Sequence, residues 1–244
     1  MTALLELEGI RKAFGRVVVA DDLSFSLASG ETLGIVGPNG AGKTSMLNLI
    51  TGSLAPDAGR ILLDGVDLAG LRAHDRARRG VARTYQIPRP FSGLTVFENV
   101  LLAASYAGRG PHDTTVTTTA SVQALERTEL LPRANQLADA LPLLDRKRLE
   151  LARALGARPT LLLLDEIAGG LTESEVGELV ATIRALKADG LTIVWVEHIV
   201  EALVSAVDRL IAMDVGRKLA EGEPRAVLAR PEVQAVYLGQ EAIE

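Results

Sequence analysis

A glycine-rich segment near the N-terminus carries the strongest chemical signal in this sequence of 244 residues. Gly37-Pro38-Asn39-Gly40-Ala41-Gly42-Lys43-Thr44 fits the pattern G-x-x-x-x-G-K-[ST], and Ser45 follows it. Glycines let a loop turn its backbone N–H groups toward a phosphate, and the lysine reaches the β and γ phosphates. The threonine hydroxyl is a ligand for Mg²⁺. Residues 37–45 therefore predict a loop that binds a nucleoside triphosphate, with Thr44 on the metal ion.

A second chemical signal lies where an apolar run meets two acids. Leu161 to Leu164 is followed at once by Asp165 and Glu166. A continuous apolar run is typical of a strand buried on both faces, and ligands of doubly wound sheets bind at the carboxyl ends of such strands. We expect Asp165 to reach Mg²⁺ and Glu166 to orient or deprotonate the attacking water. Alone, the run could equally be a strand that leaves the core, but the loop at 37–44 favours the catalytic interpretation.

His198 ends the next apolar run, in the same place relative to its strand as Asp165. This position predicts an imidazole beside the terminal phosphate. A lone histidine at a strand end is more often structural than catalytic. The correspondence with Asp165 favours a catalytic role.

The elements that must position these residues begin with β patterns. We expect strands at 4–10, 17–27, 32–36 and 60–63, the last followed by the hairpin turn pair Asp64-Gly65. A helix should start after the glycine-rich loop and close at Gly52, because its apolar residues follow at helical spacing. The loop thus lies between a buried strand and a helix, which is the context that a phosphate-binding loop requires.

The rest of the chain alternates helices and strands. Thr95 and Glu98 predict a capping box for a helix to about residue 106, and the Gly-, Pro- and Thr-rich stretch 108–119 predicts a surface loop. From residue 160 we expect a strand at 160–164, a helix that is capped by Thr172 and Glu175 and ends at Gly190, strands at 191–196 and 210–213 with a helix between them, and a terminal helical stretch. This alternation predicts an α/β fold with an antiparallel β layer at the front and a helical insertion.

Composition limits the classes of function. The 26 Lys and Arg against 31 Asp and Glu give a formal net charge of −5, which argues against a protein that coats nucleic acid. Without cysteine there is no disulfide framework and no Cys-ligated metal. We expect a cytoplasmic chain, because no apolar run approaches a membrane helix of roughly 18 to 20 residues and no signal peptide pattern opens it. For five arginines a solvated helix face is favoured over a face toward an anionic lipid surface or a partner: Arg72, Arg76, Arg78, Arg79 and Arg83.

Together these motifs resemble the ATP-binding cassette family, the motor subunits of ABC transporters, from about residue 4 to residue 238. The segment from Arg148 to Leu155 also matches that family well. The resemblance implies an ABC ATPase fold that binds ATP and Mg²⁺. It implies that Phe14 stacks on adenine, and that Gln86 senses the metal ion and water and touches the membrane subunit. Core packing is the alternative for Phe14, and without the resemblance Gln86 would be interpreted as an ordinary surface residue.

One motif departs from the family pattern. The signature Leu-Ser-Gly-Gly-Gln should precede residue 148, where this chain reads Leu141-Pro142-Leu143-Leu144-Asp145. In the family that motif contacts the γ-phosphate held on the opposite subunit. Pro142 has neither hydroxyl nor N–H, and Asp145 adds negative charge near phosphate. Either the chain pairs with a different cassette subunit, which leaves one weakened ATP site, or a helix end and loop backbone suffice and a homodimer works.

Two further segments suggest a transporter type. Residues 81–100 and 231–239 resemble the cassette subunits of branched-chain amino acid importers and of their relatives for amides and urea. The resemblance implies integral permease subunits, a second cassette and, indirectly, a solute-binding protein as partners, with no nucleic acid, at the cytoplasmic face of the membrane. An importer cassette for another solute and a soluble ABC-type ATPase remain alternatives. The soluble type usually carries two cassettes or a long coiled-coil insertion, and this sequence has neither.

We expect a single ABC ATPase domain over residues 1–244. Within it, the core with its β subdomain would occupy about 1–85 and 157–222, and the helical subdomain about 86–156. A C-terminal helical tail would take up about 223–244.

Overall fold

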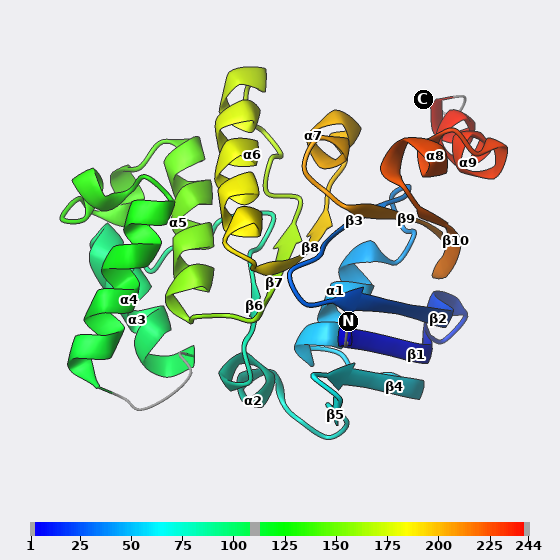
Figure 1. Ribbon diagram of the computed structural model, residues 1–244, viewed down its shortest axis with the longest axis horizontal. Coiled ribbons are helices and arrows are strands. Elements are labelled where there is room, and N and C mark those ends of the chain that lie inside the picture. Colours follow the sequence, from blue (N-terminus) through cyan, green and yellow to red (C-terminus); the bar gives the residue numbers. More distant parts are fainter. Residues whose placement is uncertain (1–2, 108–112, 242–244) are drawn as a thin grey trace. The chain divides into compact units, whose positions relative to one another are not determined.

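The computed structural model describes residues 3–107 and 113–241, and the chain divides into two compact units. The first joins residues 1–73 to residues 192–244, and the second contains residues 74–191. Strands and helices occur in both units (Figure 1). The α/β class predicted from the sequence is confirmed, whereas the expected subdomain bounds stay a prediction.

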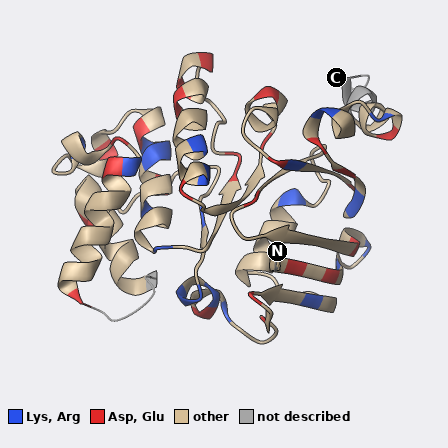
Figure 2. Cartoon of the chain, in the orientation of Figure 1, with Lys and Arg blue, Asp and Glu red and all other residues tan. Residues whose placement is uncertain are grey.

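The first unit opens with an antiparallel sheet of order β2-β1-β4-β5. β1 (Ala3–Phe14) pairs with β2 (Val17–Ala28) and β4 (Ala58–Leu63), and β4 pairs with β5 (Val66–Asp67). Figure 2 shows acidic bands along β1 and a basic band on β4, where Arg60 pairs with Glu8 at 2.7 Å. Asp64 and Gly65 join β4 to β5 with φ of 51° and 71°, as a two-residue hairpin turn requires. The predicted antiparallel layer and its turn are confirmed.

Parallel strands form the rest of the core of this unit. β3 (Thr32–Val36) is paired with both β8 (Thr192–Val196) and β9 (Arg209–Asp214), and β10 (Arg217–Gly222) runs antiparallel to β9. Every residue of β3 and β8 is buried, which explains their continuous apolar runs. The helices of this unit are α1 (Lys43–Thr51), α7 (Val200–Val204), α8 (Pro224–Leu228) and α9 (Pro231–Glu241). The mostly polar β10 was not expected from the sequence.

The second unit is mainly helical. Figure 1 shows α3 (Val96–Ala107), α4 (Thr114–Arg127) and α5 (Leu143–Gly156) side by side, and each contacts the other two. The unit also contains α2 (Ala73–Arg78), α6 (Glu173–Ala188) and the parallel pair β6 (Val81–Arg83) and β7 (Leu161–Asp165). Within residues 3–107 and 113–241, no helix combines the length and the apolar character of a membrane span.

Both predicted capping boxes are present. The N–H of Thr95 donates to Glu98 Oε2 at 2.7 Å, and the N–H of Glu98 donates to Thr95 Oγ1 at 3.2 Å, at the start of α3. Thr172 and Glu175 form the same reciprocal pair at the start of α6. The backbone and hydroxyl donors of the threonines lower the pKa of both glutamates below the ordinary value. The two helix starts are therefore fixed where the sequence predicts them.

Part of the stretch 108–119 is helical, so the predicted surface loop is wrong there. Residues 108–112 lie outside the described residues, but α4 starts at Thr114, and Asp113 accepts a hydrogen bond from the N–H of Thr115 at 2.7 Å. The hydroxyl of Thr117 donates to the carbonyl oxygen of Asp113 at 3.1 Å, so this threonine finds its partner inside the helix. Ala120 and later small residues bury one face of α4, and this buried face outweighs the turn preference of the threonines.

The prediction of one solvated arginine face is also wrong. α2 contains only six residues, and the chain then turns through Gly80 into β6. Arg76 is 4% exposed, and Arg83 lies in β6 with its side chain 5% exposed. A short helix followed by a strand cannot present all five arginines on one face.

Candidate active site

The glycine-rich loop connects β3 to α1 in the first unit, and close packing of backbone fixes its glycines. A Cβ on Gly42, where φ is 97°, would lie 2.3 Å from the carbonyl oxygen of Val19. A Cβ on Gly37, where φ is 155°, would lie 2.3 Å from the carbonyl oxygen of Met213. Glycine is therefore the residue that both positions accept.

The start of α1 suits an anion. Gly42 is the N-cap, no side chain caps the helix, and its first turn contains no acidic residue. Backbone N–H groups and the helix dipole attract phosphate at such an end. Thr44 is exposed in this first turn, and Asn39 and Gly40 are exposed in the loop that precedes it. The residues present thus fit a phosphate group with a metal ion beside it.

Lys43 is held within the same loop. Its Nζ donates to the carbonyl oxygen of Gly37 at 2.6 Å and to that of Pro38 at 2.9 Å. The residue is 5% exposed, so these charge-assisted bonds offset part of the cost of burying its ammonium group. The lysine that the pattern assigns to phosphate therefore lies against the backbone of the loop.

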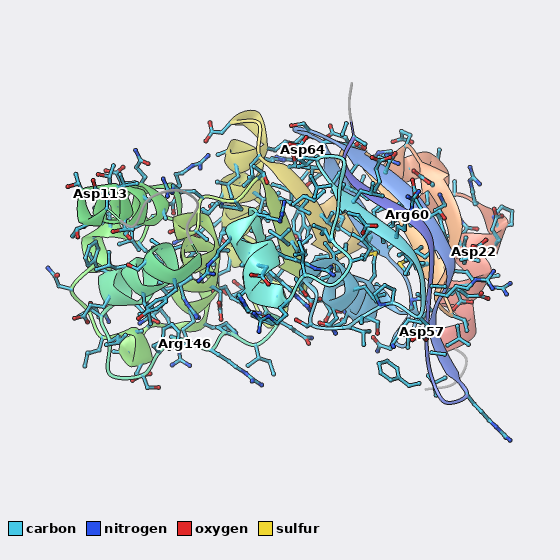
Figure 3. All side chains as sticks on the ribbon, turned by 90° about the horizontal axis from the view of Figure 1, so that it is seen from below. Asp22, Asp57, Arg60, Asp64, Asp113 and Arg146 are labelled. Carbon is cyan, nitrogen blue, oxygen red and sulfur yellow. The ribbon has the colours of Figure 1, made fainter. Side chains whose placement is uncertain are left out.

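Phe14 ends β1 as an exposed aromatic side chain. It is 54% exposed, which contradicts the core-packing alternative and leaves a ring face for stacking. Lys12 Nζ lies 5.5 Å from the ring centroid. Asp57, labelled in Figure 3, accepts hydrogen bonds from Lys12 Nζ at 2.7 Å and from the N–H of Ala13 at 2.9 Å, so it fixes the strand beside Phe14. The bond from Lys12 is the main cause that lowers the pKa of Asp57.

His198 follows β8 in the same unit as the loop. Ile35 of β3 pairs with Val196 of β8, so both strands end at one edge of the sheet. His198 is exposed there, and its N–H donates to Glu197 Oε2 at 3.0 Å. Glu197 is only 2% exposed, and sequence analysis missed it, although an acid after an apolar strand is the signal that identified Asp165.

In the second unit, Gln86 and Glu166 lie together. Gln86 Nε2 donates to Glu166 Oε2 at 2.6 Å. Glu166 is 8% exposed and has φ of 47°, although a non-glycine residue pays strain in that region. A strained residue persists only where the surrounding structure holds it, and such residues cluster at functional sites. The pairing joins two residues that sequence analysis assigned to the active site from separate motifs.

Asp165, at the end of β7, forms a buried ion pair with Arg83. The distance from Arg83 Nη2 to Asp165 Oδ2 is 2.6 Å, and the side chains are 5% and 6% exposed. The register of the parallel strands makes the pair, because Arg83 of β6 lies opposite Leu163 of β7. Sequence analysis missed this contact, since it placed Arg83 on a solvated helix.

The segment Leu141–Asp145 leads into α5. Pro142 is the N-cap and makes no side-chain capping bond, and Leu143 is 42% exposed. Asp145 is 6% exposed and lies 3.1 Å from Arg133 Nε and 3.7 Å from Arg148 Nη1. The charge that we expected to oppose phosphate is therefore balanced by two arginines of the same unit.

Known proteins resemble the chain over nearly its whole length. The model of the ABC transporter family matches residues 20–169, and that of the branched-chain amino acid ATP-binding cassette transporter family matches residues 217–243. The high-affinity branched-chain amino acid transport ATP-binding proteins LivG of Escherichia coli K12 and BraF of Pseudomonas aeruginosa are 36% and 33% identical, each over 97% of this chain and 98% of the relative.

A solved structure agrees with these relatives. The ADP conformation of an ATP-binding cassette of an ABC transporter matches the fold with a TM-score of 0.89 at 29% identity, over 98% of this chain and all of the other. The motifs at 37–45 and 165–166 lie within the family match. The chain thus belongs to the ABC transporter family and is an ATP-hydrolysing cassette of that family.

Proposed function

We propose that this chain is the ATP-hydrolysing motor subunit of a membrane importer for branched-chain amino acids or related amides. The cargo is inferred from the match at residues 217–243 and from the names of LivG and BraF. The motor role depends on one observation above all. Glu166 is buried directly after a buried strand and accepts a hydrogen bond from Gln86 at 2.6 Å, which is the arrangement that an oriented base needs.

In this proposal the first unit binds the nucleotide. The loop from Gly37 to Ser45 surrounds the phosphates with backbone N–H groups, and Lys43 attracts the β and γ phosphates. Phe14 offers its exposed ring to adenine. His198 acts at the terminal phosphate, with its backbone fixed by Glu197.

Glu166 takes the proton of the attacking water, and the amide of Gln86 keeps its carboxylate in one orientation. The oxygen donors that would hold Mg²⁺ are the Thr44 hydroxyl, the Asp165 carboxylate and the Gln86 amide oxygen, which are hard ligands of the kind this ion prefers. When bound, the ion would neutralise charge on the phosphate oxygens. In this proposal the chain supplies both the base and the phosphate contacts for hydrolysis of the nucleotide.

The segment after β6 fits a contact with an integral permease subunit. Three apolar side chains beside Gln86 are exposed, namely Tyr85 at 52%, Ile87 at 66% and Phe91 at 42%. Exposed apolar side chains that gather on one segment mark interaction sites. We place the chain at the cytoplasmic face of the membrane, where a solute-binding protein would act on it only through the permease.

The transport role is tested by purification and reconstitution. The full chain should co-purify with an integral membrane protein, and vesicles that contain both should take up leucine, isoleucine or valine when ATP is supplied on the side of this chain. Lys43→Ala is the matched control that should abolish uptake. If the vesicles took up only another solute, the importer role would stand and the proposed cargo would be wrong. ATPase activity with no membrane partner would support a soluble cassette.

We further propose that the second cassette is a different subunit. Pro142 offers no hydroxyl and no N–H, and the exposed Leu143 obstructs close approach of a phosphate to the start of α5. Light scattering of Glu166→Gln with ATP tests this proposal. A monomer that binds ATP is expected, and a stable ATP-dependent homodimer would contradict it.

A further inference from the structure

Helix α5 holds the segment that carries Gln86 through a row of side chains. Lys147 Nζ donates to the carbonyl oxygen of Gln86 at 2.6 Å. Three residues after Lys147, Glu150 Oε1 accepts a hydrogen bond from the N–H of Arg89 at 2.8 Å. After three more residues, Arg153 Nη1 donates to the carbonyl oxygen of the same Arg89, also at 2.8 Å. The spacing i, i+3, i+6 places these side chains near one another along α5, and Figure 2 shows residues of both charges on this helix.

Gln86 forms one hydrogen bond through its backbone and another through its side chain. Its backbone carbonyl accepts from Lys147 of α5, and its side-chain amide donates to Glu166 after β7. Both distances are 2.6 Å. Gln86 thus links the ammonium group of Lys147 to the carboxylate of Glu166.

Burial makes the first of these bonds strong. Lys147 is 3% exposed, and a buried ammonium group needs acceptors because water no longer solvates it. A charged donor makes a hydrogen bond roughly twice as strong as a neutral one. The carbonyl of Gln86 is therefore a firmly held point in a segment that otherwise exposes Tyr85 and Ile87.

Geometry explains why this point matters for Glu166. A glutamine side chain has three rotatable bonds, so its amide is placed only if its backbone is placed first. Glu166 itself is strained at φ of 47° and depends on its neighbours to stay there. Loss of the anchor at the Gln86 carbonyl would release the amide that holds the carboxylate.

We propose that Lys147 is a positioning residue, which acts on Glu166 through Gln86. The proposal rests on the proposed function, because it takes Glu166 as the base. α5 begins at Leu143, so Lys147 lies about one turn after the start of the helix. A displacement of the start of α5 would therefore reach the base by a path of two hydrogen bonds.

The test is a double-mutant cycle in the full chain, purified with its partner subunits. Lys147→Met removes the charge at nearly constant length and should slow single-turnover ATP hydrolysis about tenfold, because a misplaced base loses its alignment. The Kd for ATP should stay within about twofold, since the proposed anchor changes the orientation of the base and leaves the sequence of the 37–45 loop intact. Lys147→Arg should restore most of the rate. In a Gln86→Ala background, Lys147→Met should cause no further loss.

Arg153→Met is the matched control, because it removes a bond from the same helix to the carbonyl of Arg89 instead of Gln86. Its effect should add to that of Gln86→Ala. If Lys147→Met slowed hydrolysis equally in the wild type and in Gln86→Ala, the proposal would be overturned.

A second measurement separates this proposal from the proposed function. Hydrogen exchange of the backbone amides of Gln86, Ile87 and Arg89 should accelerate in Lys147→Met without nucleotide, and unchanged exchange would refute the anchoring role. If Glu166→Gln kept normal turnover, the base assignment would fail, while the exchange result would still decide whether Lys147 anchors Gln86.

Discussion

At the scale of single residues, the buried pair of Arg83 and Asp165 has the largest predicted effect on stability. Arg83→Met would leave the Asp165 carboxylate buried and without this partner. Breaking a buried pair from one side costs about 3 kcal/mol or more, so the free energy of unfolding should fall by about that amount in urea titrations at neutral pH.

Two comparisons control this prediction. Asp165→Asn, added to Arg83→Met, removes the buried charge and should recover part of the loss. Arg60→Met breaks the exposed pair with Glu8, whose side chains are 63% and 45% exposed, and should cost less than about 1 kcal/mol. A double variant as unstable as Arg83→Met alone would contradict the role of the unpaired charge.

The backbone contact of Gly42 gives a prediction about nucleotide binding. Gly42→Ala places a methyl group 2.3 Å from the carbonyl oxygen of Val19, so the loop must shift. We expect ATP affinity to fall at least about tenfold, because the N–H groups would no longer converge on phosphate. Fluorescent-nucleotide titration measures it. Gly177→Ala, where an added Cβ meets nothing within 4 Å, should bind ATP normally, and equal affinities for both variants would count against the loop geometry.

Individual site residues differ in how far the sequence predicts them. Lys43 and Glu166 belong to sequence patterns whose spacing indicates their chemistry, so both can be predicted without knowledge of the fold. Arg83 and Lys147 emerge only from tertiary contacts, because their partners lie 82 and 61 residues away in the chain. Glu197 was missed although it follows an apolar strand directly, as Glu166 follows Asp165. Charged residues in particular are missed, since a sequence does not say which of them are buried.

At the scale of elements, the capping box of α6 predicts a dependence on pH. The hydrogen bonds from Thr172 lower the pKa of Glu175 from its ordinary value of 4.5. Because the unfolded state binds the proton more tightly, the stabilisation is complete above pH 4.5 and is lost as the pH falls through the lower pKa of the folded state. The stability difference between the wild type and Glu175→Ala should therefore shrink when urea unfolding is measured at pH 3 instead of pH 7.

Glu173→Ala provides the comparison within the same turn. It removes an acidic residue from the first turn of α6 and leaves the reciprocal bonds of Thr172 and Glu175 in place. Its stability difference should be smaller at pH 7 than that of Glu175→Ala. A Glu175→Ala difference that grew toward low pH would contradict the sign of the predicted pKa shift.

Elements are predicted well where local chemistry specifies them. The capping boxes at Thr95 and Thr172 and the turn at Asp64 depend on side chains within a few residues of each other. α4 was missed because its threonines favour turns, whereas its buried small residues and the Asp113 cap favour a helix. β10 was missed because an outer strand needs little apolar patterning and gains its partner from β9.

At the scale of the whole molecule, the residues that we assign to the active site are divided between the two units. The phosphate loop, Phe14 and His198 belong to the first unit, and Gln86 and Glu166 belong to the second. The alternation of strands and helices was enough to predict an α/β fold. The strand register that pairs Arg83 with Asp165 was not, because it depends on how distant segments align.

The central claim, that Glu166 is the base of an ATPase, is tested most directly by Glu166→Gln in the full chain with its partner subunits. Glutamine keeps the shape of the side chain but cannot accept the proton of water. We predict that ATP binds with an affinity close to that of the wild type, while steady-state turnover falls at least about 100-fold. Lys43→Ala should weaken both binding and turnover. Normal turnover by Glu166→Gln would contradict the account.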